Sequence, residues 1–167
     1  MPIVLCRVDE RLVHGQVVLG WGANVRPSRY IIVDADLADA EWEQELYRLG
    51  LPTGATAEFQ TPEEAAEHLP DWVDSEIRTL VLFRGLGSVV ELAKAGVLKG
   101  ESVNLGGIHY APGRREILPF LHLEQEDLGR IRSLDECGVE VVAQELPGSP
   151  RWDGDELIRR GSRLWND

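Results

Sequence analysis

Short apolar runs of strand length recur along the chain, separated by polar stretches with helical periodicity. The predicted strands cover Ile3–Val8, Tyr30–Val33, Ala55–Phe59, Thr79–Phe83, Ser102–Leu105, Ile117–Leu121 and Val139–Gln144. Because strands that alternate with helices form parallel sheets with right-handed crossovers, the pattern favours an α/β fold. We therefore expect a mainly parallel central sheet of about seven strands with helices on both faces.

The stretches between these strands carry start and stop signals for helices. Thr61, Pro62 and Glu64 combine an N-cap, a first-turn proline and a capping-box glutamate, and Gly50 is a stop signal. The predicted helices cover 15–21, 39–49, 61–69, 87–95, 124–137 and 155–165. No internal repeat or low-complexity linker divides the pattern, so we expect a single domain over residues 1–167.

One turn carries the candidate chemistry of the chain. After the first predicted strand, the segment Arg7-Val-Asp-Glu-Arg-Leu-Val-His14 sets an imidazole among guanidinium and carboxylate groups. A neutral imidazole is a nucleophile near pH 7, since its unperturbed pKa is about 6.5. Phosphoryl transfer needs fixed positive charge around the peripheral oxygens, which Arg7 and Arg11 would supply. The segment therefore predicts a histidine that carries a phosphoryl group.

The neighbours of His14 support this prediction. If a helix begins at Gly15, its free backbone N–H groups favour an anion beside the imidazole. Gly15 also removes a side chain next to the ring and lets the backbone approach closely. Asp9 either orients an arginine or fixes the histidine tautomer by hydrogen bonding. Both roles remain open from the sequence.

Other strand ends are expected to meet this turn, because ligands bind beyond the carboxyl ends of the strands in an open parallel sheet. These ends are Asp34–Asp36, Arg84-Gly85 and Gly106–His109. Gly106 and Gly107 either bring the backbone close to a phosphate or a partner, or make a tight turn. His109 either lies near His14 or faces solvent as a loop residue.

Composition narrows the classes of partner. The chain carries 17 Lys and Arg against 29 Asp and Glu, a formal charge of −12, which opposes attraction to nucleic acid and anionic lipid. No apolar run approaches the roughly 20 residues that span a bilayer, and no signal-peptide pattern opens the chain. We therefore predict a cytoplasmic protein with no nucleic-acid partner. Cys6 and Cys137 make no metal cluster, so no metal is expected, and most of the five tryptophans are expected to pack in the interior.

The segment Arg7–Val17 resembles the active-site signature of the IIB component of the mannose/fructose/sorbose family of the bacterial phosphotransferase system. Further segments that resemble the family are Ile31–Asp34, Leu80–Phe83, Ser88–Val97, Val103–Gly107 and Cys137–Val141. The resemblance covers the chain up to Glu145. Two segments depart from the usual family sequence, namely Asp34-Ala35-Asp36 in place of an Asp-Asp pair and Ile108-His109-Tyr110 in place of a Met-Arg-Phe type. Ala35 and His109 leave the choice of partner open.

The resemblance implies that His14 is the phosphoryl acceptor, through Nδ1, and that Arg11 with support from Arg7 steadies the group. The loop expected to wrap the phosphoryl group comprises Asp9, Glu10, Leu12, Val13, Gly15 and Gln16. Residues expected to support the site from its surroundings are Asp34, Arg84, Gly106, Gly107 and His109. No cofactor is implied beyond the transient phosphoryl group.

The implied partners are a phosphorylated IIA protein or domain as donor, IIC and IID membrane permease components, and a sugar as final acceptor. Two other functions remain open from the sequence. One is a regulatory phosphorelay protein that is not coupled to sugar transport. The other is a binding module in which His14 has no chemical role. Monomer and homodimer are both compatible with the sequence.

Overall fold

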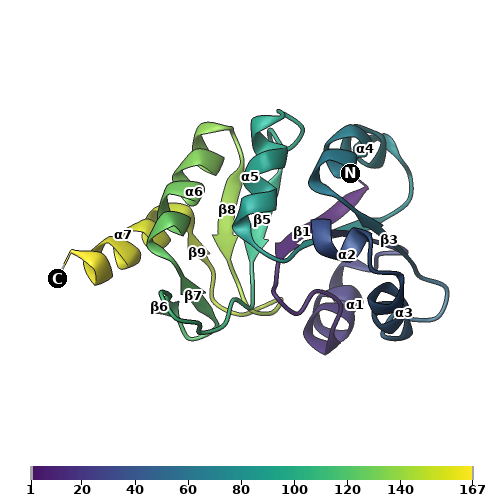
Figure 1. Ribbon diagram of the computed structural model, residues 1–167, viewed down its shortest axis with the longest axis horizontal. Helices are drawn as coiled ribbons and strands as arrows, with labels where there is room; N and C mark the ends of the chain where they lie inside the picture. The colour runs from purple at the N-terminus through teal and green to yellow at the C-terminus, as the bar shows by residue number, and fades with distance from the viewer. Residues whose placement is uncertain (1, 167) are drawn as a thin grey trace.

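The computed structural model describes residues 2–166 and places a seven-stranded sheet at the centre (Figure 1). Its strands, in spatial order, are β3 (Thr56–Gln60), β2 (Arg29–Val33), β4 (Thr79–Phe83), β1 (Ile3–Val8), β5 (Ser102–Leu105), β8 (Glu140–Ala143) and β9 (Trp152–Asp153). All neighbours pair in parallel except β8 and β9. The predicted α/β fold with a mainly parallel sheet is confirmed.

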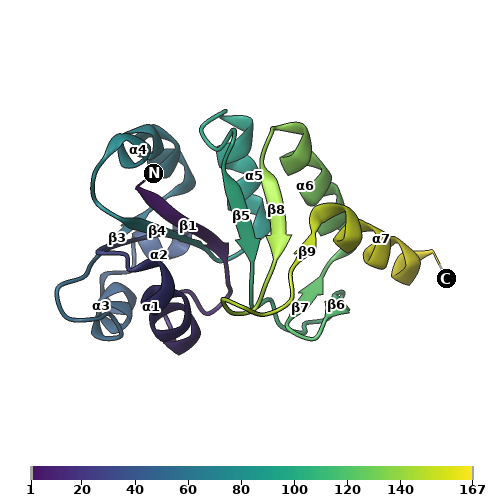
Figure 2. The same cartoon turned by 180° about the vertical axis from the view of Figure 1, so that it is seen from behind.

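Helices cover both faces of this sheet (Figures 1 and 2). They are the π-helix η1 (Gln16–Trp21), α1 (Gly22–Val25), α2 (Ala35–Ala38), α3 (Glu41–Leu49), α4 (Pro62–Asp74), α5 (Leu86–Lys94), α6 (Gln125–Glu136) and α7 (Gly154–Trp165). Val81 and Phe83 point into a large cluster beneath α4, α5 and α6, while Leu80 and Leu82 point into a smaller one beneath η1 and α2. This alternation along β4 is the period of two expected for a strand buried on both faces.

Local sequence signals explain several helix ends. Thr61 and Glu64 form the predicted capping box of α4, which continues beyond the expected end at Leu69 to Asp74. The predicted helix over 39–49 begins later, at Glu41, and a separate short helix α2 precedes it. The side chain of Asp34 caps α2, because its Oδ2 accepts a hydrogen bond from the Leu37 backbone nitrogen at 3.0 Å.

The prediction of one strand over Ile117–Leu121 is wrong. This stretch divides into β6 (Arg115–Leu118) and β7 (Leu121–Leu123), which pair antiparallel as a separate two-stranded sheet. Pro119 and Phe120 form the turn between them. A proline cannot donate to a sheet ladder, so it ends β6 at this point. The seventh strand of the main sheet is instead the short β9, which has no apolar pattern of its own.

The carboxyl end of β1 lies between the ends of its two neighbours, β4 and β5. Asp9 continues β1 and donates its backbone N–H to the Phe83 carbonyl at 2.9 Å, and Gly106 donates to the Val8 carbonyl at 2.8 Å. Residues that follow β1, β4 and β5 are therefore held together at the edge of the sheet where the strands have their carboxyl ends. None of the helices within residues 2–166 is long and apolar enough to cross a membrane.

Candidate active site

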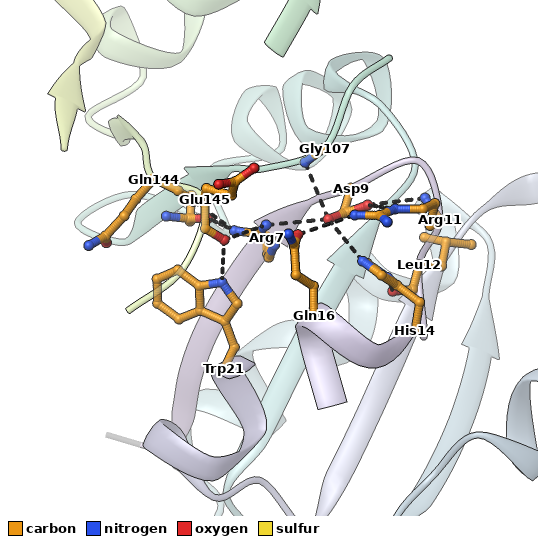
Figure 3. Close-up of polar contacts among 11 residues, drawn as sticks. Arg7, Asp9, Arg11, Leu12, His14, Gln16, Trp21, Gly107, Gln144 and Glu145 are labelled. Carbon is orange, nitrogen blue, oxygen red and sulfur yellow. Dashed lines mark hydrogen bonds and ion pairs between the residues drawn. The ribbon is translucent and has the colours of Figure 1, made fainter. Parts of the chain in front are cut away.

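The buried carboxylate of Asp9 lies at the centre of a polar cluster at this edge (Figure 3). Its Oδ2 is 3.3 Å from Arg7 Nη2, 3.7 Å from His14 Nε2, and 3.2 Å from the Gly107 backbone nitrogen, which donates to it. Its Oδ1 accepts the backbone N–H of Arg11 at 3.1 Å. The sequence left two roles open for Asp9, and in the structure this one side chain faces both an arginine and the imidazole.

Arg7 is buried completely and its guanidinium is occupied by groups of the protein. Nη1 donates to the Asn104 side chain and, at 2.9 Å, to the Gln144 carbonyl, while Nη2 donates to the Glu145 carbonyl at 3.1 Å. Burial lowers the pKa of Arg7, and the adjacent Asp9 opposes this by raising it. An arginine with no exposed surface cannot touch a phosphoryl group in this arrangement. The supporting role expected of Arg7 would therefore act through Asp9, which its guanidinium contacts.

Gly106 and Gly107 leave room for this network. A Cβ atom on Gly106 would lie 2.2 Å from Cζ of Arg7, and one on Gly107 would lie 3.2 Å from Oδ1 of Asp9. The backbone at both positions therefore approaches the protein's own Arg7 and Asp9 closely. The expected approach to a phosphate or a partner stays a prediction.

His14 is held between a backbone carbonyl and Asp9, with 15% of its side chain exposed. Nδ1 lies 2.9 Å from the Leu12 carbonyl, which only accepts, so Nδ1 carries the ring proton in this arrangement. Nε2 is buried, has no hydrogen-bond partner among residues 2–166, and faces Asp9. Burial lowers the pKa of His14, and this effect exceeds the opposing influence of Leu12 and Asp9. The imidazole is therefore neutral near pH 7.

The segment that follows Asp9 is held in place by the apolar packing of Leu12 and Val13. Leu12 adopts a left-handed backbone conformation with φ of 55°, and its side chain, like that of Val13, packs into the smaller core cluster. The conformation directs the Leu12 carbonyl at the imidazole. Leu12 and Val13 thus hold the loop through apolar burial while only the backbone faces the site.

The outer side of the loop is open. The Arg11 side chain is 45% exposed, and its Nη2 donates to Oε1 of Gln16 at 3.2 Å. A Cβ atom on Gly15 would meet nothing within 4 Å. The predicted helix after His14 is present, although its first part is π-helical, and the His14 carbonyl accepts from both Val17 and Val18. Arg11 Nε also lies 3.7 Å from Asp9 Oδ1, so Arg11 is the cation of this loop that both pairs with Asp9 and presents surface to an incoming anion.

The predicted residues Asp34, Arg84 and Glu10 form a neighbouring cluster, together with Arg114. Arg84 Nε is 3.2 Å from Asp34 Oδ1, and Arg114 pairs with Glu10. Burial lowers the pKa of Arg84, but its bonds to Asp34 dominate and the net direction is upward. These four side chains line a cavity of about 380 Å³ with Gly85, Gly87 and Ser88. Their expected convergence on His14 is therefore only partial. Of the four, Glu10 alone belongs to the loop over residues 9–16 that carries His14, which we call the histidine loop.

His109 is exposed, and its carbonyl accepts a hydrogen bond from Arg114 at 2.8 Å. No hydrogen bond joins His109 to His14 within the part of the chain that the structure describes. Of the two interpretations of His109, the structure matches the solvent-facing loop residue.

Sequence reasoning missed part of this network. Asn104 is buried in β5 between Val103 and Leu105, and a lone amide in an apolar strand was the available signal. Gln144 and Glu145 contribute backbone carbonyls, which no side-chain pattern reveals. Trp21 also donates its indole N–H to the Glu145 carbonyl at 3.0 Å.

Comparison with known proteins gives the family of this fold and site. The model of the sorbose subfamily of phosphotransferase-system IIB components matches residues 3–166. The chain belongs to this IIB family. The sorbose-specific EIIB component of Klebsiella pneumoniae is 29% identical over 152 residues, which cover 90% of this IIB chain and 91% of that protein. The predicted family is thereby confirmed.

Other relatives differ in the sugar that they are named for. The N-acetylgalactosamine-specific IIB component 2 of Escherichia coli is 28% identical over 159 residues, or 95% of this IIB chain and 100% of that protein. The crystal structure of the IIB domain of the Klebsiella pneumoniae sorbose permease superposes with a TM-score of 0.83 at 27% identity, covering 98% of each chain. The mannose-specific EIIAB component of Escherichia coli is 27% identical over 170 residues, but these span only 49% of that longer protein.

Proposed function

We propose that His14 of this IIB component accepts a phosphoryl group from a phosphohistidine on a IIA protein and passes it to a sugar. The observation that carries the proposal is the neutral imidazole of His14 beside Asp9, with exposed Arg11 in the same loop. Phosphoryl transfer requires a nucleophile, positive charge and accurate placement more than elaborate chemistry. The family to which the chain belongs performs this transfer.

The proposed step exchanges one P–N bond for another. A ring nitrogen of His14 attacks phosphorus in line, the bond to the donor histidine breaks, and the electron pair returns to the donor imidazole. Arg11 neutralises charge on the peripheral oxygens. No group besides the two proteins and the phosphoryl group enters the balance, so the proposal includes no cofactor.

We assign the attack to Nδ1, which requires a change of tautomer. The hydrogen bond from Nδ1 to Leu12 breaks, Nδ1 loses its proton to solvent, and Nε2 gains one. The new Nε2–H then faces the carboxylate of Asp9, now 3.7 Å away, which holds the ring in the reactive tautomer. In this account Arg7 is a positioning residue because it fixes Asp9.

The proposed partners follow from the same reaction. A phosphorylated IIA protein is the donor, and IIC and IID membrane components present the sugar to this domain at the cytoplasmic side. The relatives are named for sorbose, fructose, mannose and N-acetylgalactosamine, which form a first panel of sugars. The two departures at Ala35, in α2, and at His109, in an exposed loop, are positions at which partner choice would be set.

The first test is the intact mass of the protein after incubation with phosphoenolpyruvate, the general phosphotransferase proteins and a IIA protein. We expect one acid-labile phosphoryl group on the wild type and none on His14→Gln. Arg11→Ala should fold and accept the group about 10²–10³ times more slowly, as expected for loss of a charge-stabilising group. Arg163→Ala, an exposed arginine of α7, is the matched control and should keep the wild-type rate.

Each half of the proposal has its own contradicting result. An unmodified wild type with an active donor would refute the carrier role, and an unchanged rate in Arg11→Ala would refute its assignment. Modification without delivery to any sugar in the presence of permease would instead favour the regulatory phosphorelay. Nitrogen NMR of the phosphorylated protein distinguishes Nδ1 from Nε2, and phosphorus on Nε2 would refute the tautomer change.

A further inference from the structure

The helix α3 exposes an apolar stripe and attaches to the body through the opposite face, which carries Gln44 and Tyr47. Trp42, Leu46 and Leu49 follow the i, i+4, i+7 spacing and so share one face, which we call the α3 stripe. Their exposed fractions are 76%, 51% and 83%. A surface helix normally turns such a stripe to the core, so its exposure marks a binding surface. Most of the five tryptophans were expected to pack inside, and Trp42 is the exception.

The opposite face of α3 shows why the stripe cannot turn inward. Gln44 donates its amide to the carbonyls of Leu37 at 2.8 Å and Ala38 at 3.0 Å. Tyr47 is half-buried and its ring centroid lies 6.5 Å from that of Phe59. These contacts fix the orientation of α3 about its own axis, so the stripe remains at the surface.

Acidic residues border the α3 stripe. Glu41, Glu43 and Glu45 are exposed, and at 100° per residue they lie on both sides of the stripe. Arg48 pairs with Glu45 at 2.6 Å, whereas Glu41 and Glu43 make no ion pair within residues 2–166. The surface is thus apolar along its centre and negative at its rim.

This charge pattern selects the occupant. A second copy of the chain would bring acidic rims together, and a formal charge of −12 opposes self-association as well. Anionic lipid headgroups would be repelled in the same way. A protein segment with apolar residues flanked by Lys and Arg complements both features. Cytoplasmic loops of membrane proteins carry an excess of Lys and Arg, so a permease presents this chemistry.

The position of the α3 stripe also fits a partner that works with His14. Gly50 follows α3, and a Cβ atom there would lie 3.7 Å from Cγ1 of Val13, the residue before His14. Both views of the ribbon place α3 and α1 on the same side of the sheet, where the histidine loop leads into η1 (Figures 1 and 2). The end of α3 that carries Leu49 is therefore adjacent to the segment that leads to His14, and a partner on the stripe would approach the loop from this end.

We propose that the α3 stripe docks a basic, apolar cytoplasmic segment of the membrane permease during delivery of the phosphoryl group to the sugar. This inference rests on the proposed function and names the surface that its second half-reaction uses. It predicts that the stripe serves delivery and not uptake from the IIA donor, because the transferable phosphoryl group makes that donor more negative at its active site.

The test measures the two half-reactions separately with the full chain. Uptake uses phospho-IIA protein, and delivery uses membrane vesicles that contain the IIC and IID proteins with a labelled sugar. In Trp42→Gln with Leu46→Gln, we expect uptake within about twofold of wild type and delivery reduced about tenfold or more, as for loss of central interface residues. Glu43→Lys should reduce delivery in the same selective way.

Matched controls lie away from α3. Ile77→Gln removes another exposed apolar side chain, and Glu67→Lys reverses an exposed charge on α4, so both should deliver at the wild-type rate. Unchanged delivery in the stripe variants would overturn the inference, as would an equal loss of uptake or a wild-type dimer that the variants dissociate. A wild type that accepts no phosphoryl group would refute the proposed function itself, and with it this role. Normal uptake with unaffected delivery in the variants refutes the stripe alone.

Discussion

At the scale of single residues, Gly106 is where one added methyl group meets the site most directly. Its ideal Cβ would lie 2.2 Å from the buried Arg7 guanidinium, which has other hydrogen bonds to keep and little room to move. Gly106→Ala should therefore destabilise the fold by about 1–3 kcal/mol, the usual cost of overpacking. Urea unfolding monitored by tryptophan emission measures this loss.

Gly129→Ala is the matched control for that substitution. Gly129 lies inside α6, and a Cβ atom there meets nothing within 4 Å. Alanine should raise the stability by about 0.5–1 kcal/mol, because it restricts the unfolded chain. If Gly106→Ala unfolded at the same urea concentration as wild type, the close approach to Arg7 would not constrain this position.

The lowered pKa of His14 makes a separate prediction about pH. Burial disfavours the charged imidazole, so the folded protein binds this proton less readily than the unfolded chain, where the pKa is about 6.5. The contribution of His14 to stability is thus present above pH 6.5 and lost as the pH falls through the folded-state pKa. Relative to His14→Gln, the wild type should lose unfolding free energy between pH 8 and pH 5. A difference that is constant over this range, or that grows in favour of wild type at low pH, would contradict it.

At the scale of elements, the sequence predicted most accurately the strands that are buried on both faces. All five residues of β4 are buried, and Thr79 followed by the apolar run Leu80–Phe83 predicted both ends of the strand correctly. The hairpin of β6 and β7 was missed because its apolar run continues through Pro119. β9 is only two residues long and exists because the segment after β8 returns to the sheet edge. Such short pairings depend on tertiary contacts that no local pattern contains.

The same distinction applies to the candidate site. His14, Asp9 and Arg11 lie within one turn, so their grouping could be predicted from sequence spacing. Arg7 was named in support of Arg11 because its charge is visible in the sequence, whereas its complete burial is not. Its partners are backbone carbonyls about 140 positions away in the chain, such as Gln144, and only the fold brings these groups together.

The capping box of α4 offers a test at the element scale. The Thr61 hydroxyl accepts the backbone N–H of Glu64 at 3.1 Å, and the Glu64 side chain accepts the backbone N–H of Thr61 at 3.3 Å. Thr61→Ala should cost about 1 kcal/mol of unfolding free energy, because it leaves one helix donor without its side-chain partner. Thermal unfolding measures the loss, and Thr53→Ala in the preceding loop should leave the stability unchanged. Equal stability of both variants would show that solvent replaces the cap.

At the scale of the whole molecule, Arg7 joins segments that are far apart in the chain. Its guanidinium binds Asp9 after β1, Asn104 in β5 and the carbonyls of Gln144 and Glu145 after β8. It also lies over the Trp21 ring, with Cζ 5.3 Å from the ring centroid. One buried cation thus connects the early, middle and late parts of the chain beneath the candidate site.

Removal of this cation should therefore affect fold and chemistry together. Arg7→Met removes the cation closest to the buried Asp9 carboxylate and leaves it the longer 3.7 Å contact with Arg11, and breaking a buried ion pair typically costs about 3–5 kcal/mol. For a chain of this size each kcal/mol lowers the melting temperature by about 2–4 °C, so calorimetry should record a fall of roughly 6–20 °C. Arg7→Lys keeps the charge but not the planar set of donors, and should fall between Arg7→Met and wild type. Arg130→Met breaks a partly exposed pair with Asp127 and should cost no more than about 1 kcal/mol. The contrary result would be an Arg7→Met variant with the same melting temperature as Arg130→Met and the wild-type rate of phosphoryl acceptance. The buried network would then neither stabilise the fold nor position Asp9.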